Sequence, residues 1–179
     1  MSNTRHGRVG TVDRAIMARI AAIQSPMLDE VMPRLSRAAN HSVLWVGVAA
    51  GLALTGSRPA RRAAGRGLAS VAVASAVSNV IGKGLTGRAR PSAEVPPARR
   101  LTHGQPRTTS FPSGHAASAA AFATGAALEL PALAVPVGAL AAGVGASRVV
   151  TGVHYPSDVL AGFAIGVGAA LLTRRLARR

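Results

Sequence analysis

The 179-residue sequence contains no cysteine, and this absence excludes several kinds of site at once. Without thiols the chain has no disulfide framework, no cysteine nucleophile and no thiolate metal site. Aromatic residues make up only 3% of the composition, too few for a surface that stacks nucleic-acid bases. Acidic residues number 6 against 21 lysines and arginines, which gives a net charge of +15. This charge favours an anionic partner such as a phosphate group or an acidic lipid surface.

The basic residues are concentrated in a few segments, and the stretches between them are apolar and nearly uncharged. The apolar runs cover about 42–55, 67–85, 114–130, 133–147 and 157–173. Each run is near the lower limit of about 17–25 residues for a membrane-spanning helix. Their alternation with basic loops nevertheless predicts an all-α, polytopic bundle of about five spans, in which abundant Ala and Gly let helices pack closely. A soluble alanine-rich bundle is the alternative.

The N-terminal segment shows a different pattern from the apolar runs. Ile16, Ile20 and Ile23 recur at helical spacing, whereas Arg14 and Arg19 lie elsewhere on the helix. This pattern predicts an amphipathic helix lying at a membrane surface. We therefore divide the chain into a basic amphipathic segment, 1–40, and a transmembrane domain, 41–179.

An up-and-down arrangement of the five runs would bring polar residues from distant parts of the sequence to one membrane face. Ser113 fits the N-cap of the third helix, and Pro156 fits the first turn of the fifth. Two helix N-termini near several cations form a natural anion site, and two histidines can divide the work of phosphoryl transfer. The polar residues at these helix ends are Lys83, Ser113, His115, Arg148, His154 and Asp158.

Three segments resemble the signature motifs of the type 2 phosphatidic acid phosphatase (PAP2) superfamily, with complete spacing inside each motif. They are KGLTGRARP with Lys83, Arg90 and Pro91, PSGH from Pro112 to His115, and SRVVTGVHYPSD with Ser147, Arg148, His154 and Asp158. The resemblance covers about residues 40–173. It implies a helical membrane bundle, often described with six spans, that hydrolyses lipid phosphates without a metal or other cofactor.

The resemblance also implies a role for each site residue. His154 would attack phosphorus and form a phosphohistidine, and Asp158 would orient and polarise it. His115 would protonate the departing oxygen and then help to activate the hydrolytic water. The phosphoryl oxygens would be held by Lys83, Arg90, Ser113, the N–H of Gly114 and Arg148. His103, in the basic central loop, matches no motif but could contact a substrate.

Several substrates are consistent with this resemblance. The family includes enzymes that act on phosphatidic acid, phosphatidylglycerol phosphate and polyprenyl diphosphates. The Ala/Arg/Val-rich composition indicates a high-GC source, and analogy with actinobacteria adds a decaprenylphosphoryl-phosphoribose phosphatase. The expected partners are a lipid phosphate and the bilayer, without nucleic acid, and the oligomeric state is left open.

Two other classes of protein are weighed against a lipid phosphatase. A non-catalytic basic membrane protein that binds anionic lipid is disfavoured by the intact His154 and Asp158 pair. A soluble, vanadate-binding haloperoxidase relative is disfavoured by the apolar runs and the short chain.

The distribution of arginine predicts the orientation of the chain in the cell membrane. Arginines at 58–66 and 174–179 would lie on the face opposite the site. If the positive-inside bias acts on them, that face is cytoplasmic and the active site is extracytoplasmic.

Overall fold

The regular structure is helical throughout the part of the chain that the computed structural model describes. This part comprises residues 3–84, 87–91, 96–101 and 108–177, with the side chains of 3–9, 82–84 and 99 not described. The α-helices are α1 (Asn3–Ala22), α2 (Met32–Ala38), α3 (Val43–Leu54), α4 (Arg58–Gly84), α5 (Gly114–Glu129), α6 (Ala134–Val150) and α7 (Pro156–Leu176). The predicted all-α fold is confirmed, and each of the five apolar runs lies largely in one of the helices α3 to α7.

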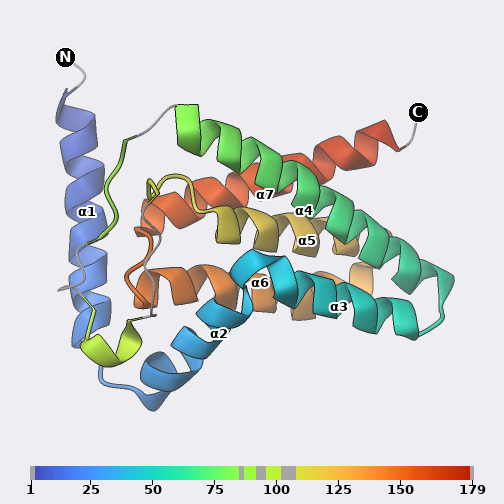
Figure 1. Ribbon diagram of the computed structural model, residues 1–179, viewed down its shortest axis with the longest axis horizontal. Coiled ribbons are helices and arrows are strands. Elements are labelled where there is room, and N and C mark those ends of the chain that lie inside the picture. The colour runs from blue at the N-terminus through green and yellow to red at the C-terminus, as the bar shows by residue number, and fades with distance from the viewer. Residues whose placement is uncertain (1–2, 85–86, 92–95, 102–107, 178–179) are drawn as a thin grey trace.

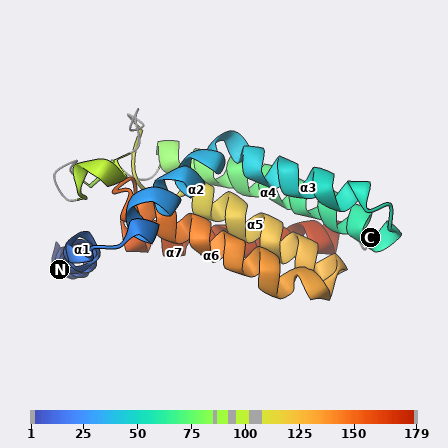
Figure 2. The same cartoon turned by 90° about the horizontal axis from the view of Figure 1, so that it is seen from below.

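Helices α3 to α7 lie side by side in a bundle, whereas α1 crosses one end of it. Figure 1 shows α1 upright beside the end where α5 and α7 begin, and Figure 2 shows α1 end-on at the same place. The C-terminus of α7 and the connection between α3 and α4 lie at the opposite end. The predicted convergence of helix ends therefore occurs at the end that α1 covers.

Helix α5 forms the centre of the bundle because its side chains are small enough to be surrounded on all sides. Ten of its sixteen residues are buried, most of them alanines. A Cβ atom at Gly162 would overlap the backbone oxygen of Ser113, and one at Gly166 would overlap that of Ala117. The glycine pair on α7 thus allows direct backbone contact with α5, as small residues at four-residue spacing do in membrane helices.

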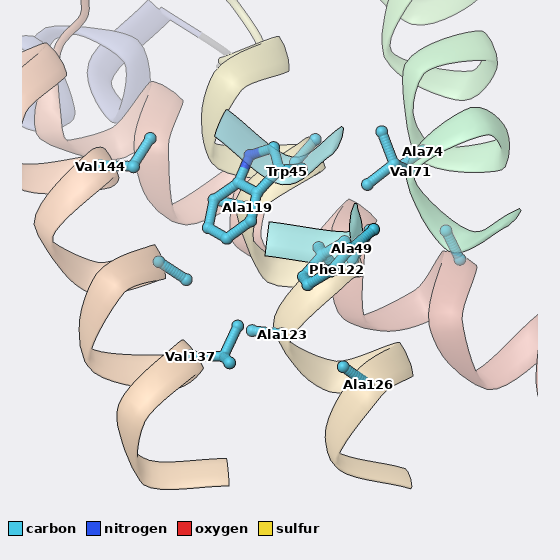
Figure 3. Packing of buried hydrophobic residues seen from close by; sticks show 14 of the residues in the cluster. Trp45, Ala49, Val71, Ala74, Ala119, Phe122, Ala123, Ala126, Val137 and Val144 are labelled. Atoms are coloured by element: carbon cyan, nitrogen blue, oxygen red, sulfur yellow. The ribbon is translucent and has the colours of Figure 1, made fainter. Parts of the chain in front are cut away.

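An aromatic pair fixes α3 against this small-residue bundle. Trp45 on α3 stacks on Phe122 of α5 with ring centroids 5.3 Å apart and an interplanar angle of 28°. Figure 3 shows the pair among small residues of α4 and α6, including Ala74 and Val137. The two rings fill space that the surrounding alanines and valines leave open.

The membrane character of the chain is confirmed, although fewer helices than predicted meet the length and composition expected of a span. Among the described residues the segments that do are Arg58–Ile81, Pro131–Val150 and Pro156–Leu176. The apolar segment Asn40–Leu54 is shorter, and the 16-residue α5 is enclosed by its neighbours. Outward-facing apolar residues such as Val80, Val135 and Leu160 remain exposed, as a lipid-facing surface requires.

Candidate active site

His154 lies between α6 and α7 in a turn held by the backbone of α6. Its N–H donates to the carbonyl of Arg148 at 3.1 Å, and its side chain is buried. Nδ1 lies 2.7 Å from the carbonyl oxygen of Ser110, which can only accept a hydrogen bond, so Nδ1 carries the proton. Nε2 therefore has the lone pair, and it faces Nη1 of Arg90 at 3.3 Å.

The surroundings of His154 keep its imidazole neutral. Burial lowers the pKa of His154, and the positive charges of Arg90 and Arg148 lower it further, while the carboxylate of Asp158 acts in the opposite direction. A neutral imidazole with a free lone pair on Nε2 is the form that can act as a nucleophile.

Asp158 supports His154 through its charge and through the start of α7. Its Oδ2 accepts a hydrogen bond from the backbone N–H of Tyr155 at 2.9 Å and lies 3.8 Å from Nδ1 of His154. The proton on Nδ1 is thus donated to Ser110, which is nearer than the carboxylate. Ser110 was not predicted as a site residue, because the sequence does not indicate where a backbone carbonyl points.

Arg90 is fixed beside Nε2 of His154 by backbone carbonyls. Its guanidinium donates to the carbonyls of Val153 at 2.9 Å, Thr108 at 3.0 Å and Thr109 at 3.1 Å. Burial lowers the pKa of Arg90, against the opposing charge of Asp158. The charge is therefore held in place before any substrate arrives, which is how an enzyme stabilises a phosphoryl group at low reorganisation cost.

Arg148 is a second fixed cation and retains an unused hydrogen-bond donor. Its Nη1 donates to the Oγ of Ser36 at 2.6 Å and to the Ser36 carbonyl at 3.1 Å, and the residue is 3% exposed. Its Nε is buried without a hydrogen-bond partner among the described residues. Because buried donors are nearly always paired, this free N–H indicates a site for an anion.

The start of α5 faces the same region with open space. Ser113 is confirmed as the N-cap: its Oγ accepts from the N–H of Ala116 at 3.3 Å, and its own N–H donates to the carbonyl of Asp158. A Cβ atom at Gly114 would meet nothing within 4 Å. His115 follows, and its Nε2 lies 3.0 Å from Oδ1 of Asn40, which accepts a hydrogen bond from it.

The structure therefore brings the second and third motifs together with Arg90 of the first. Pro156 begins α7, as predicted. Lys83 lies near the end of α4, but its side chain is outside the described part of the chain, as is all of His103.

A buried network joins α1 to the site, and this connection was not predicted from the sequence. Asp13 of α1 is 3% exposed. Its Oδ2 accepts from Nη2 of Arg88 and from the Oγ of Ser157, both at 2.6 Å, and its Oδ1 accepts from the N–H of Ser157 at 3.0 Å. Asp13 thus caps α7 from another helix, where a negative charge is favoured.

Arg88 extends this network from Asp13 to Asp158. Its Nη1 donates to Oδ1 of Asp158 at 2.7 Å, and its guanidinium lies 4.2 Å from the ring centroid of Tyr155. Burial lowers the pKa of Arg88, but the two carboxylates outweigh this effect, so its pKa is raised overall. The side chain remains charged and holds Asp158 behind His154.

A second contact ties the N-terminal segment to the central loop. The fully buried Arg100 donates from Nε to Oδ1 of Asp29 at 2.6 Å, and from its Nη atoms to the carbonyls of Ile20 and Ile23. A smaller apolar cluster places Met17 of α1 against Val149 and Val159. The N-terminal segment is therefore packed on the bundle as well as being basic.

Comparison with known proteins identifies the family to which these motifs belong. The PAP2 superfamily model matches residues 63–179. The chain belongs to the PAP2 superfamily, and as a membrane member of it the protein is a lipid phosphate phosphatase.

Two relatives and one solved structure are similar over most of the chain. The decaprenylphosphoryl-5-phosphoribose phosphatase of Mycobacterium tuberculosis is 38% identical over 169 residues, covering 87% of this chain and 88% of that protein. The Mycolicibacterium smegmatis enzyme of the same name is 39% identical over 72% of this chain and 67% of its own length. A transmembrane phosphatidylglycerolphosphate phosphatase from Bacillus subtilis superimposes with a TM-score of 0.71 at 26% identity, covering 96% of this chain and 87% of that one.

Proposed function

We propose that the protein removes the terminal phosphate from a lipid-linked phosphosugar through a covalent phosphohistidine on Nε2 of His154. The observation that carries the mechanism is the neutral, buried imidazole whose unprotonated nitrogen faces Arg90. The substrate class is supported by the mycobacterial phosphoribose phosphatases, which are 38–39% identical to this chain.

In the first step, Nε2 of His154 attacks phosphorus and the bond between phosphorus and the sugar oxygen breaks. The negative charge of the bound phosphate favours the protonated form of His115, which donates its proton to that oxygen, so the oxygen leaves as a hydroxyl group. Arg90, Arg148 and the backbone N–H of Gly114 bind the phosphoryl oxygens. Lys83, Ser113 and the charge of the N-terminus of α5 contribute to the same binding.

In the second step, water attacks phosphorus and the bond from phosphorus to Nε2 breaks. His115, now neutral, accepts a proton from the water, and inorganic phosphate leaves. Throughout both steps the carbonyl of Ser110 keeps the proton on Nδ1, and the charge of Asp158 stabilises the imidazole as it becomes cationic.

For the membrane setting, we propose that all five helices from α3 to α7 cross the bilayer and that α1 lies along its surface. The support is the crossing of α1 over one end of the bundle, with Val12, Ile16 and Ile23 exposed while Asp13 and Met17 are buried. Such a helix would rest its apolar side on the lipid and its buried side on the protein. The site would then face outward, since arginines 58–66 mark the other end as cytoplasmic.

Rapid-quench labelling tests the covalent mechanism directly. With a lipid phosphate carrying ³²P in the scissile group, the wild-type enzyme should give an acid-labile phosphoenzyme, whereas His154→Ala should give none and lose turnover to background. His6→Ala serves as a matched control, because it removes a histidine that lies outside the motifs. Near-normal turnover by His154→Ala would refute the proposed nucleophile.

A further inference from the structure

A cavity of about 320 Å³ lies beside His115, between the start of α5, the end of α4 and the turn Asn40–Ser42 that precedes α3. His154, Arg90 and Arg148 do not line it. Its size is at the lower end of the range of about 300–1,000 Å³ that is usual for ligand pockets. The residues around it are Ala39, His41, Ser42, Ser75, Ser78, Asn79, Gly114, His115 and Ser118.

Most of the described residues around this cavity have polar side chains, and none of these described residues is acidic, a lysine or an arginine. All of its residues except Ala39 and Gly114 have a hydroxyl, amide or imidazole group. Neutral donors and acceptors of this kind suit the hydroxyl groups of a ligand, and the described part of the lining offers no ion pair to a carboxylate or an amine.

One of these hydroxyls is left without a partner. Ser78 is 7% exposed, and its Oγ makes no hydrogen bond to any described residue. Ser75 and Ser118, by contrast, lie 3.4 Å apart through their Oγ atoms. A buried hydroxyl without a partner is costly, so Ser78 is arranged for a group that arrives with the substrate.

The cavity also lies where the departing group must be. In-line displacement places the nucleophile and the leaving oxygen on opposite sides of phosphorus. With His154 as the nucleophile and His115 as the acid, the leaving group lies on the side of His115. Resting on the proposed function, we infer that this cavity binds the leaving group, and that this group is a sugar with free hydroxyls.

Exposed valines lie close in sequence to the cavity residues of α4 and of the turn before α3. Val43 and Val46 follow Ser42 on α3, and Val77 and Val80 flank Ser78 and Asn79 on α4. These four valines are 38–73% exposed. The polyprenyl chain of such a substrate, which is joined to the sugar through a phosphodiester, would find an apolar surface near the cavity.

The substitution Ser78→Ala tests this inference, because it removes the hydroxyl and leaves no protein group unpaired. The measured quantity is kcat/KM for two substrates, a polyprenylphosphoryl-5-phosphoribose and phosphatidic acid, whose leaving group has no free hydroxyl. We expect a loss of about 3- to 10-fold for the phosphosugar, the equivalent of one neutral hydrogen bond, and less than 2-fold for phosphatidic acid. The Tm of the variant should match that of the wild type.

Ser70→Ala is the matched control on the same helix. Its Oγ bonds to the carbonyl of Arg66 and to the Oγ1 of Thr173, away from the cavity. This variant should lose Tm and affect both substrates equally. Asn79→Ala provides a second test at the rim, with the same substrate-selective loss expected as for Ser78→Ala.

The results distinguish a failure of the sugar site from a failure of the proposed phosphatase function. Equal losses on both substrates, or no loss on either, would overturn the sugar site while leaving the phosphatase function intact. An equal penalty with phosphatidylglycerol phosphate, whose leaving glycerol has a free hydroxyl, would overturn the assignment to a sugar. Failure of the wild type to hydrolyse any of the three lipids would overturn the proposed function and the cavity assignment with it.

Discussion

The two nitrogens of His154 face different partners, and this asymmetry determines which of them can react. The carbonyl of Ser110 holds the proton on Nδ1, so the lone pair on Nε2 is directed toward Arg90. Arg90 in turn is held by several carbonyls and cannot follow the imidazole if the ring rotates. The nucleophile and the cation are thus positioned independently before substrate binds.

The lowered pKa of His154 predicts the acid side of the pH profile. The neutral form is required for attack, and its ordinary pKa is about 6.5. Because the folded protein lowers that pKa, kcat/KM should stay high as the pH falls to 6.5 and decline only below that value.

A phosphate monoester also titrates near pH 6. A variant is therefore needed to show whether the acid limb of the pH profile comes from the enzyme or from the substrate. Asp158 raises the pKa of His154, and Asp158→Asn should therefore move an enzyme-derived acid limb to lower pH. A limb above pH 7 in the wild type, or one that stays fixed in the variant, would contradict the assignment to His154.

The fixed guanidinium groups predict that activity persists in EDTA. Arg90 and Arg148 supply positive charge of the kind that a divalent ion supplies in other phosphoryl-transfer enzymes. Turnover of a lipid phosphate by detergent-purified protein should be unchanged after dialysis against EDTA. A loss that returns on adding Mg²⁺ would show that these side chains do not provide enough charge.

At the scale of elements, Asp13, Arg88 and Asp158 connect α1 to the neighbourhood of His154, the proposed nucleophile. Removing one member of a buried ionic network leaves the others without compensation. The effect should reach the site, because Arg88 also holds the carboxylate behind His154. Asp13 is therefore a positioning residue that acts through Arg88 and α7.

The substitution Asp13→Asn should lower kcat by about 10- to 100-fold, which is the scale of a small misplacement of reacting groups, with a smaller change in KM. Arg88→Gln should behave in the same way. Glu30→Gln is the control: its ion pair with Arg34, at 3.8 Å, is exposed, so this variant should have normal kinetics. If Asp13→Asn instead raised KM by about 10- to 100-fold and left kcat unchanged, Asp13 would act in substrate binding and not in positioning.

The elements differ in how far the sequence could predict them. The five apolar runs predicted five helices, since a long uncharged stretch has few other stable forms in a membrane. Ser113 and Pro156 marked helix starts because capping is local. Asp13 carried no comparable signal, as its partners lie 75 and 144 residues away. The resemblance implied that Asp158 orients His154, but the backbone carbonyl of Ser110 lies nearer to Nδ1 than the carboxylate does, and a sequence does not show where a carbonyl points.

At the scale of the whole molecule, the two ends of the bundle carry different sets of residues. One end contains the motifs and is covered by α1, and the other contains the arginines 58–66 and the end of α7. The positive-inside bias then sets which end faces the cytoplasm. The cell must deliver the lipid phosphate to the end that contains the motifs.

Single cysteines can test this orientation without background, because the sequence has none. Gln24→Cys lies just after α1 at the site end, and Ser57→Cys lies between α3 and α4 at the other end. A membrane-impermeant maleimide applied to intact cells should label Gln24→Cys well and Ser57→Cys only after lysis. The reverse pattern would place the site in the cytoplasm, and labelling of both in intact cells would disprove the five-span arrangement.

The direct backbone contact between α5 and α7 also bears on how the protein could escape an inhibitor. A compound in the cavity beside His115 would touch Asn79, whose exposed side chain can change without disturbing the bundle. It would also touch Ser118, which is enclosed in α5, where a larger residue has no room. We therefore expect single substitutions that confer resistance at exposed positions of α4 that contact the compound, and rarely at positions of α5.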